Sequence, residues 1–226
     1  MATANIANAL LQRGLRNTYL LGVQPIAADQ PRLVGPAFTL RFIPAREDLD
    51  SMRSYGSAAN MHRRAIEECP SGAVLVIDSH GVATAASAGD LMAARLKVRG
   101  VAGLVTDGGF RDTPAMRNVG LPAYQVRPAP PATPIALHPA ELNVAIGCAG
   151  VAVYPGDIVV GDAEGVVVIP QHLADEVAAD ALAAVEYEDF AERHIARGRT
   201  LFGLFPASVE SRIEYQAWVA AGRPAI

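Results

Sequence analysis

Two apolar segments that each run into an aspartate constrain the fold of this chain more than any other feature. Residues 73–78 read Ala-Val-Leu-Val-Ile-Asp, and residues 101–109 read Val-Ala-Gly-Leu-Val-Thr-Asp-Gly-Gly. Continuous apolar runs of this length are typical of strands that are buried on both faces of a sheet. Residues 91–99 between them are rich in helix formers and stop at Gly100. Strand, helix and strand within about 35 residues is the size of a βαβ unit, so the sequence predicts an α/β fold.

The remaining segments predict further helices and strands around this unit. Helices are expected at residues 3–13, 57–68 and 114–118, which end near glycine, proline or a polar residue. Strands are expected at 32–42, as one bent strand or a pair, and at 121–126 and 144–153. Residues 158–162 and 165–170 are expected to form a hairpin. The proline-rich residues 128–139 are expected to be a loop.

The chain changes character at Gln171. Residues 174–197 predict one long helix, and residues 208–221 predict a last helix with Trp218 as its packing anchor. The apolar face of the long helix is expected to consist of Val177, Ala181, Leu182 and Val185. We therefore divide the chain into a catalytic core, residues 1–170, and a C-terminal helical extension, residues 171–226. The extension is suited to form an interface or to cover a site.

Composition limits the possible partners and the location. The net charge is −4 and the pI is about 5.7, whereas nucleic-acid-binding domains usually carry a basic face. Cys69 and Cys148 match no CxxC spacing, which favours free thiols in a reducing compartment. The N-terminal residues lack the pattern of a signal peptide, and no apolar run reaches membrane-spanning length. We expect a cytoplasmic protein with no nucleic-acid or membrane partner.

Gly89 and Asp90 stand directly before the predicted helix at 91–99. A helix N-terminus exposes unpaired N–H groups and the positive end of the helix dipole, so it binds carboxylates and phosphates readily. A glycine at this place lets a ligand approach the backbone closely. Taken alone, Asp90 is more simply interpreted as the cap of the helix.

Arg111 and Asp112 follow the second apolar run through a glycine-rich bend. Arg111 can bind a 2-oxo acid and offset the charge of a developing enolate. Asp112 can hold a divalent ion, because magnesium suits one or two carboxylates with several retained waters. The simpler alternative is a surface ion pair. The βαβ geometry, however, brings Gly89-Asp90 and Arg111-Asp112 to the same end of neighbouring strands, and this favours one shared pocket. The five histidines show no metal-binding spacing.

These segments resemble the RraA-like family, which contains the 4-hydroxy-4-methyl-2-oxoglutarate aldolases and the regulator of ribonuclease activity A. The resemblance is carried by residues 89–91, 99–103 and 107–112, with further matches at 34–37, 155–157 and 162–166. It covers roughly residues 3–170. It implies a layered α-β-β-α sandwich, and a homotrimer or a hexamer (a dimer of trimers) with sites at subunit interfaces.

The resemblance also implies roles for the residues of the pocket. The residue matching Asp112 holds Mg²⁺ or Mn²⁺, partly through water, and the one matching Arg111 binds the 2-oxo acid and stabilises the enolate. The backbone amides matching Leu91 and Met92 hold the pyruvyl carboxylate, while the acid matching Asp90 orients a water for proton transfer.

The match to the family weakens after Pro170. Some aldolases of the family complete the site with a glutamate from the C-terminal region of a neighbouring subunit. In this chain the candidates are Glu186, Glu188 and Glu192. The extended tail from residue 198 onward also differs from a minimal aldolase, which leaves the substrate open.

Three functions follow from the resemblance. The first is a class II, metal-dependent carbon–carbon lyase, namely a pyruvate-forming aldolase with oxaloacetate decarboxylase activity that acts on a small 2-oxo acid. The second is a sugar-acid dehydratase or a 2-keto-3-deoxy sugar-acid aldolase, which would use the same charge stabilisation. The third is a non-enzymatic regulator of ribonuclease activity. Because Asp90, Arg111 and Asp112 are all present, the sequence favours an enzyme.

Overall fold

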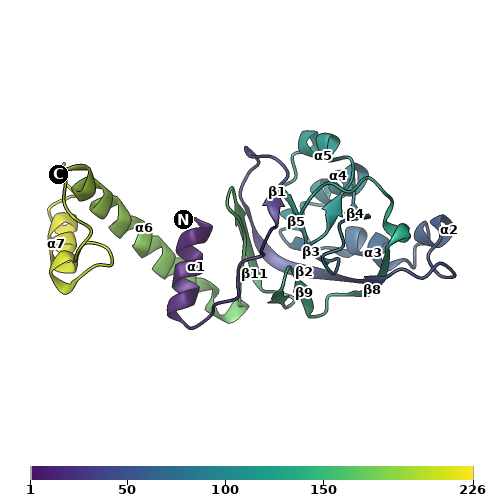
Figure 1. Cartoon of the computed structure of the whole chain (residues 1–226), viewed down its shortest axis with the longest axis horizontal. Coiled ribbons are helices and arrows are strands. Elements are labelled where there is room, and N and C mark those ends of the chain that lie inside the picture. Colours follow the sequence, from purple (N-terminus) through teal and green to yellow (C-terminus); the bar gives the residue numbers. More distant parts are fainter. Residues whose placement is uncertain (1, 226) are drawn as a thin grey trace.

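The centre of the protein is a mixed β-sheet (Figure 1). The structure is a computed structural model that describes residues 2–225. Over these residues, an eight-stranded sheet has the order β1-β7-β5-β3-β2-β11-β12, and β8 pairs with β2 off this path. The strands of the sheet are β1 (Gln24–Pro25), β2 (Leu33–Pro44), β3 (Val74–Asp78), β5 (Gly103–Thr106), β7 (Ala123–Gln125), β8 (Leu137–Leu142), β11 (Ile158–Asp162) and β12 (Gly165–Ile169).

The predicted βαβ unit is present. β3 and β5 are parallel neighbours, with Val74 opposite Gly103 and Ile77 opposite Thr106. The helix α4 (Asp90–Val98) connects them. Every residue of both strands is buried, as expected for parallel strands covered on both faces. The predicted second strand is shorter than expected, since β5 ends at Thr106.

Two small sheets lie beside the main one. One pairs β4 (Ala86–Ala88) with β6 (Gly109–Phe110), and the other pairs β9 (Ile146–Cys148) with β10 (Val151–Val153). The glycines at the end of the expected second strand therefore belong partly to a separate sheet. This small β4–β6 sheet positions the candidate site.

Helices lie on both sides of the sheet (Figure 1). The helices α3 (Met61–Glu68), α4 and α5 (Thr113–Val119) pack on one face around the buried Leu75 and Leu104. At the other edge of the sheet, α1 (Thr3–Gln12) and the first half of α6 (Ala174–Ala196) pack against β11 and β12. This arrangement confirms the expected layered α/β fold.

Three element predictions were partly wrong. The residues expected as one strand at 144–153 form two antiparallel strands, β9 and β10. The helix expected at 57–68 begins only at Met61, because the side chain of Asn60 accepts hydrogen bonds from the amides of His62 and Arg63 and so caps the helix there. A separate short helix, α2 (Met52–Tyr55), precedes it. The region expected to be a loop contains a 3₁₀ turn, η1 (Thr133–Ile135), and the start of β8. β8 contains Pro139, which is tolerated because β8 is an edge strand.

The two helices predicted after residue 170 are present as α6 and α7 (Val209–Ala220), and they form an arm that projects from the sheet (Figure 1). α7 folds back on the far half of α6 around a cluster of Phe190, Ala191, Leu204 and Trp218. Val177 and Ala181 on the near half are fully buried against α1 and β12, whereas Leu182 is 55% exposed instead of packed. No helix within residues 2–225 combines the length and apolarity that crossing a membrane requires.

Candidate active site

The small β4–β6 sheet brings the two chemistry-bearing segments together. Its strands are parallel, with Ala88 opposite Phe110, and the amide of Arg111 donates to the carbonyl of Ala88 over 3.0 Å. Gly89 and Arg111 are thus the first residues beyond two paired strands. A Cβ atom on Gly89 would lie 2.9 Å from Cγ of Arg111 and 3.2 Å from Oδ2 of Asp112.

All six residues singled out from the sequence line one cleft of about 280 Å³. This size suits a small metabolite rather than a dinucleotide. The predicted members are Gly89, Asp90, Leu91, Met92, Arg111 and Asp112. Further lining residues are Met52, Tyr55, Arg63, Ala88, Ala132 and Thr133. The chemical roles of the six residues stay predictions.

Arg111 and Asp112 form an ion pair inside this cleft. Nε of Arg111 lies 3.0 Å from Oδ2 of Asp112, and both side chains are about half-exposed. Asp112 directly precedes α5, yet its carboxylate makes no capping hydrogen bond to that helix. Its φ of 55° is left-handed, a conformation that aspartate and asparagine adopt more readily than most residues. The backbone therefore presents the Asp112 carboxylate to the cleft instead of using it as a cap.

The N-terminus of α4 forms another wall of the cleft. Gly89, not Asp90, is the cap residue, and Asp90 is the first residue of the helix. The amide of Leu91 donates to Oδ1 of Asp90 over 2.8 Å. A carboxylate therefore already lies at this helix end, as the dipole favours. An incoming carboxylate can use the Leu91 amide only if the Asp90 side chain turns away.

Sequence reasoning missed the other side of the cleft, which α2 and α3 supply. The hydroxyl of Tyr55 lies 3.1 Å from Nδ1 of His62 and 3.3 Å from Oγ1 of Thr133. The guanidinium of Arg63 lies over the Tyr55 ring, with Cζ 4.6 Å from the ring centroid. Burial raises the pKa of the Tyr55 phenol and lowers the pKa of His62 to about 3. These residues show no motif, and their proximity to Arg111 depends on long-range packing.

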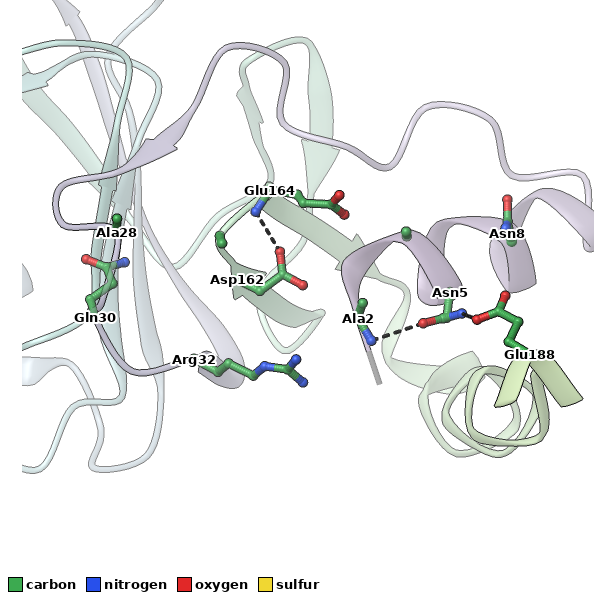
Figure 2. Close-up of a pocket in the computed structure, with 11 residues that line it drawn as sticks. Ala2, Asn5, Asn8, Ala28, Gln30, Arg32, Asp162, Glu164 and Glu188 are labelled. Atoms are coloured by element: carbon green, nitrogen blue, oxygen red, sulfur yellow. Dashed lines mark hydrogen bonds between the residues drawn. The ribbon is translucent and has the colours of Figure 1, made fainter. Parts of the chain in front are cut away.

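The three C-terminal glutamates do not reach this cleft in their own chain. Glu188 lines a second cleft, of about 490 Å³, between the start of α1 and the β11–β12 turn (Figure 2), where it accepts from Nδ2 of Asn5 over 2.9 Å. Glu186 pairs with Arg223 at 3.2 Å. Glu192 is exposed on α6.

The donor set of the first cleft fits a hydrated divalent cation. Its carboxylates are those of Asp90 and Asp112, and among residues 2–225 no group of three or more histidine, cysteine or acidic side chains could enclose a metal ion. Magnesium is usually bound through one or two carboxylates with several waters retained, so two acids are sufficient for it. The buried Asp107 serves another purpose, since it accepts hydrogen bonds from the amides of Ser79 and Gly81.

The sheet, the flanking helices and the cleft define an α/β protein with a small site, lined by a few charged side chains, at the ends of paired parallel strands. The family model RraA-like, described as Aldolase/RraA, matches residues 3–168, and the chain belongs to this family. The family expected from the sequence is thereby confirmed.

Individual relatives include proteins named for enzymatic and for regulatory roles. A protein of Halalkalibacterium halodurans, provisionally named a 4-hydroxy-4-methyl-2-oxoglutarate aldolase, is 34% identical over 149 residues, 66% of this chain. The match spans 65% of that relative's length. The structure of Streptomyces coelicolor RraAS2, described as an unusual member of the RNase ES inhibitor RraA protein family, is 32% identical with a TM-score of 0.74. The match covers 88% of this chain and 92% of RraAS2.

A third similar structure is an uncharacterized protein from Pseudomonas syringae pv. tomato. It is 27% identical, has a TM-score of 0.76, and the match covers 90% of this chain and 92% of that one. The high coverage of both chains means that the likeness includes more than the sheet core. The helical extension is therefore compatible with a fold already known from solved structures.

Proposed function

We propose that this protein is a divalent-metal-dependent lyase that forms pyruvate by cleaving the carbon–carbon bond beside a 2-oxo acid. The proposed activities are those of a 4-hydroxy-4-methyl-2-oxoglutarate aldolase and an oxaloacetate decarboxylase. The observation that carries this proposal is the convergence of Arg111, Asp112 and the α4 N-terminus on one small cleft. The name of the Halalkalibacterium halodurans relative adds support.

Each residue has a chemical task in this proposal. The free nitrogens of Arg111 bind the 2-oxo acid and offset the negative charge that grows on the 2-oxo oxygen when the bond breaks. Asp112 would hold Mg²⁺ or Mn²⁺, which when bound supplies further positive charge beside that oxygen. The amides of Leu91 and Met92 bind the carboxylate of the pyruvyl group.

Asp90 has two positions in this scheme. In the structure its Oδ1 accepts from the Leu91 amide. When the substrate carboxylate takes that amide, the Asp90 side chain is released. It can then orient a water molecule that accepts the proton of the substrate's 4-hydroxyl group as the carbon–carbon bond breaks and returns a proton to the carbanionic carbon of the pyruvate enolate, which completes the reaction.

We further propose that the active form is a homotrimer or hexamer. The arm supports self-association, because large apolar side chains on it are strongly exposed in the single chain, for example Phe202 at 92% and Val209 at 70%. In such an assembly, the arm of one subunit could bring Glu186, Glu188 or Glu192 to the cleft of a neighbouring subunit. Sedimentation velocity tests this proposal, since a monomer at micromolar concentration would contradict it.

The test of the reaction is pyruvate release from oxaloacetate and from 4-hydroxy-4-methyl-2-oxoglutarate. Both substrates are assayed with magnesium and with excess chelator, and chelation is expected to stop the release. Release that persists at the same rate in chelator would contradict the proposed metal dependence. Absence of release from both substrates by the folded, magnesium-supplied protein would contradict the reaction itself.

One observation supports a second candidate function. The likeness to RraAS2 covers most of both chains, and that protein is described within a family of RNase ES inhibitors. A regulator of ribonuclease activity is therefore the alternative. It predicts direct binding to an RNase E-type enzyme that survives the loss of Asp112, whereas the lyase loses its activity without that carboxylate.

A further inference from the structure

Arg63 is a cation on the wall of the candidate site that has no carboxylate partner among residues 2–225. It lies in the first turn of α3, is half-buried, and lines the same cleft as Arg111. Its Nε donates to the carbonyl of Tyr55 over 3.4 Å. Within the described range 2–225, no acidic side chain forms an ion pair with it. The next residue, Arg64, differs in this respect, because its Nε lies 2.6 Å from a carboxylate oxygen of Glu68.

Arg63 is held in place by a chain of contacts. Its guanidinium is stacked on the Tyr55 ring, and the Tyr55 hydroxyl contacts Thr133 at 3.3 Å. Thr133 in turn donates to the carbonyl of Ala86 in β4 over 2.6 Å. A stacked arginine that is oriented in advance loses little conformational freedom when a ligand binds, which favours tight binding of a small anion.

The guanidinium groups of Arg63 and Arg111 therefore belong to the same small cleft. The positive charges of Arg63 and Arg111 both lower the pKa of Tyr55, although the larger effect of burial raises it overall. Both cations are thus within electrostatic reach of the same phenol. Arginine matches a carboxylate through two parallel hydrogen bonds, so each guanidinium can receive one carboxylate or 2-oxo acid group.

We propose that Arg63 is a specificity-determining residue that binds the second carboxylate of a dicarboxylic 2-oxo acid, while Arg111 binds the 2-oxo acid end. This inference rests on the proposed function and assigns the residue that selects its dicarboxylic substrates. It favours substrates with an acidic group at the far end. It disfavours aldonic sugar acids and their 2-keto-3-deoxy derivatives, because their far end is a neutral polyol that would leave the Arg63 charge without a partner.

The test compares two ligands with the same five-carbon chain, 2-oxoglutarate and 2-oxopentanoate, which differ by the second carboxylate. Their affinities for the magnesium-supplied protein are measured by titration calorimetry, and the readout is the ratio of the two affinities. The wild type is expected to prefer 2-oxoglutarate by at least tenfold. In Arg63→Gln the ratio is expected to fall at least tenfold, and in Arg63→Lys by a smaller factor because the charge remains.

Arg64→Gln is the matched control, since it removes the neighbouring arginine from the exposed face of the same helix. It is expected to keep the wild-type ratio. A purely structural role of Arg63 would change both affinities together and leave the ratio unaltered, which would overturn the inference. A wild type without preference for 2-oxoglutarate would overturn it as well.

Binding is measured without turnover, so failure of the inference can be separated from failure of the proposed reaction. A protein that releases no pyruvate but shows the Arg63-dependent preference would refute the reaction and retain the subsite. A protein that releases pyruvate and shows an unchanged affinity ratio in both Arg63 variants would support the reaction and refute the subsite. If Arg63→Gln does not fold, the wild-type preference and Arg63→Lys decide the question.

Discussion

Gly89 and Arg111 lie so close together that a methyl group on the glycine would come within 2.9 Å of the arginine Cγ. The same methyl group would lie 3.2 Å from the Asp112 carboxylate. The φ of Gly89 is −146°, a value that any residue adopts, so the backbone itself does not require glycine. Glycine is required here because the Arg111–Asp112 pair leaves room for a hydrogen atom at this position but not for a methyl group.

Gly89→Ala is therefore expected to damage activity more than stability. The added carbon must displace the Arg111–Asp112 pair, and small displacements of reacting groups can lower the rate by about 10²-fold. The measurements are kcat/KM for oxaloacetate and the melting temperature. Gly147→Ala is the matched control, because an added Cβ there meets no atom within 4 Å. Equal activity in the two variants would contradict the packing argument.

Asp112→Asn separates the charge of this residue from its backbone role. Asparagine tolerates the left-handed φ of 55° at this position, whereas alanine is expected to cost about 1–2 kcal/mol of stability. Asp112→Asn should therefore unfold like the wild type in urea while losing about 10²-fold or more in metal-dependent turnover. Asp112→Ala should lose both stability in urea and metal-dependent turnover. Wild-type turnover in Asp112→Asn would show that the residue does not hold the metal.

His62 is expected to make stability depend on pH. Burial lowers its folded-state pKa to about 3, so as pH falls through 6.5 the unfolded chain takes up a proton that the folded one does not. The free energy of unfolding should therefore fall as pH drops from about 6.5 towards 3, by about 2 kcal/mol between pH 7 and pH 5. Urea titrations at both values should show this loss in the wild type and less of it in His62→Gln. The exposed His172→Gln should behave like the wild type.

The arm is expected to unfold separately from the sheet. Its cluster around Phe190 is distinct from the clusters that cover the sheet, and Trp218, the single tryptophan of the chain, lies within it. Phe190→Ala should cost about 3–5 kcal/mol locally. Tryptophan emission should then shift to the red, while hydrogen exchange in β3 stays slow.

Arg212→Ala is the control for this experiment, because Arg212 is an exposed polar residue on the same helix as Trp218. It should leave the emission of Trp218 unchanged. Faster exchange in β3 of Phe190→Ala would show that arm and sheet unfold as one unit.

The sequence was sufficient to predict the elements with strong local signals. The apolar runs at β3 and β5 and the stop at Gly100 predict a βαβ unit, because burial on both faces leaves an unmistakable pattern. The juxtaposition of Gly89 and Arg111 also follows from that unit. Its immediate cause, the small β4–β6 sheet, was missed, since strands of two or three residues have too few positions to show a period.

Other features depend on tertiary contacts that no local pattern records. Arg63 reaches the cleft because α3 packs beside α4 and β8. Tyr55, at the end of α2, is held there by contacts with His62 and Thr133.

Leu182 is predicted to lie on the apolar face of α6, yet it is exposed because the buried stripe runs through Val177 and Ala181, and Leu182 lies about 100° further around the helix than Ala181. The hydrogen bond from the Leu91 amide to Asp90 likewise depends on the side-chain rotamer of Asp90, which no sequence pattern records.

The most direct test of the proposed metal-dependent lyase is deuterium exchange into the methyl group of pyruvate. An enzyme that stabilises the pyruvate enolate removes and returns a methyl proton even without a second substrate, so proton NMR in D₂O should show loss of the methyl signal. With magnesium we expect the wild type to catalyse this exchange. Chelator should stop the exchange, and Asp112→Asn should not catalyse it. Exchange no faster than in protein-free buffer, by folded protein supplied with magnesium, would contradict the proposed reaction.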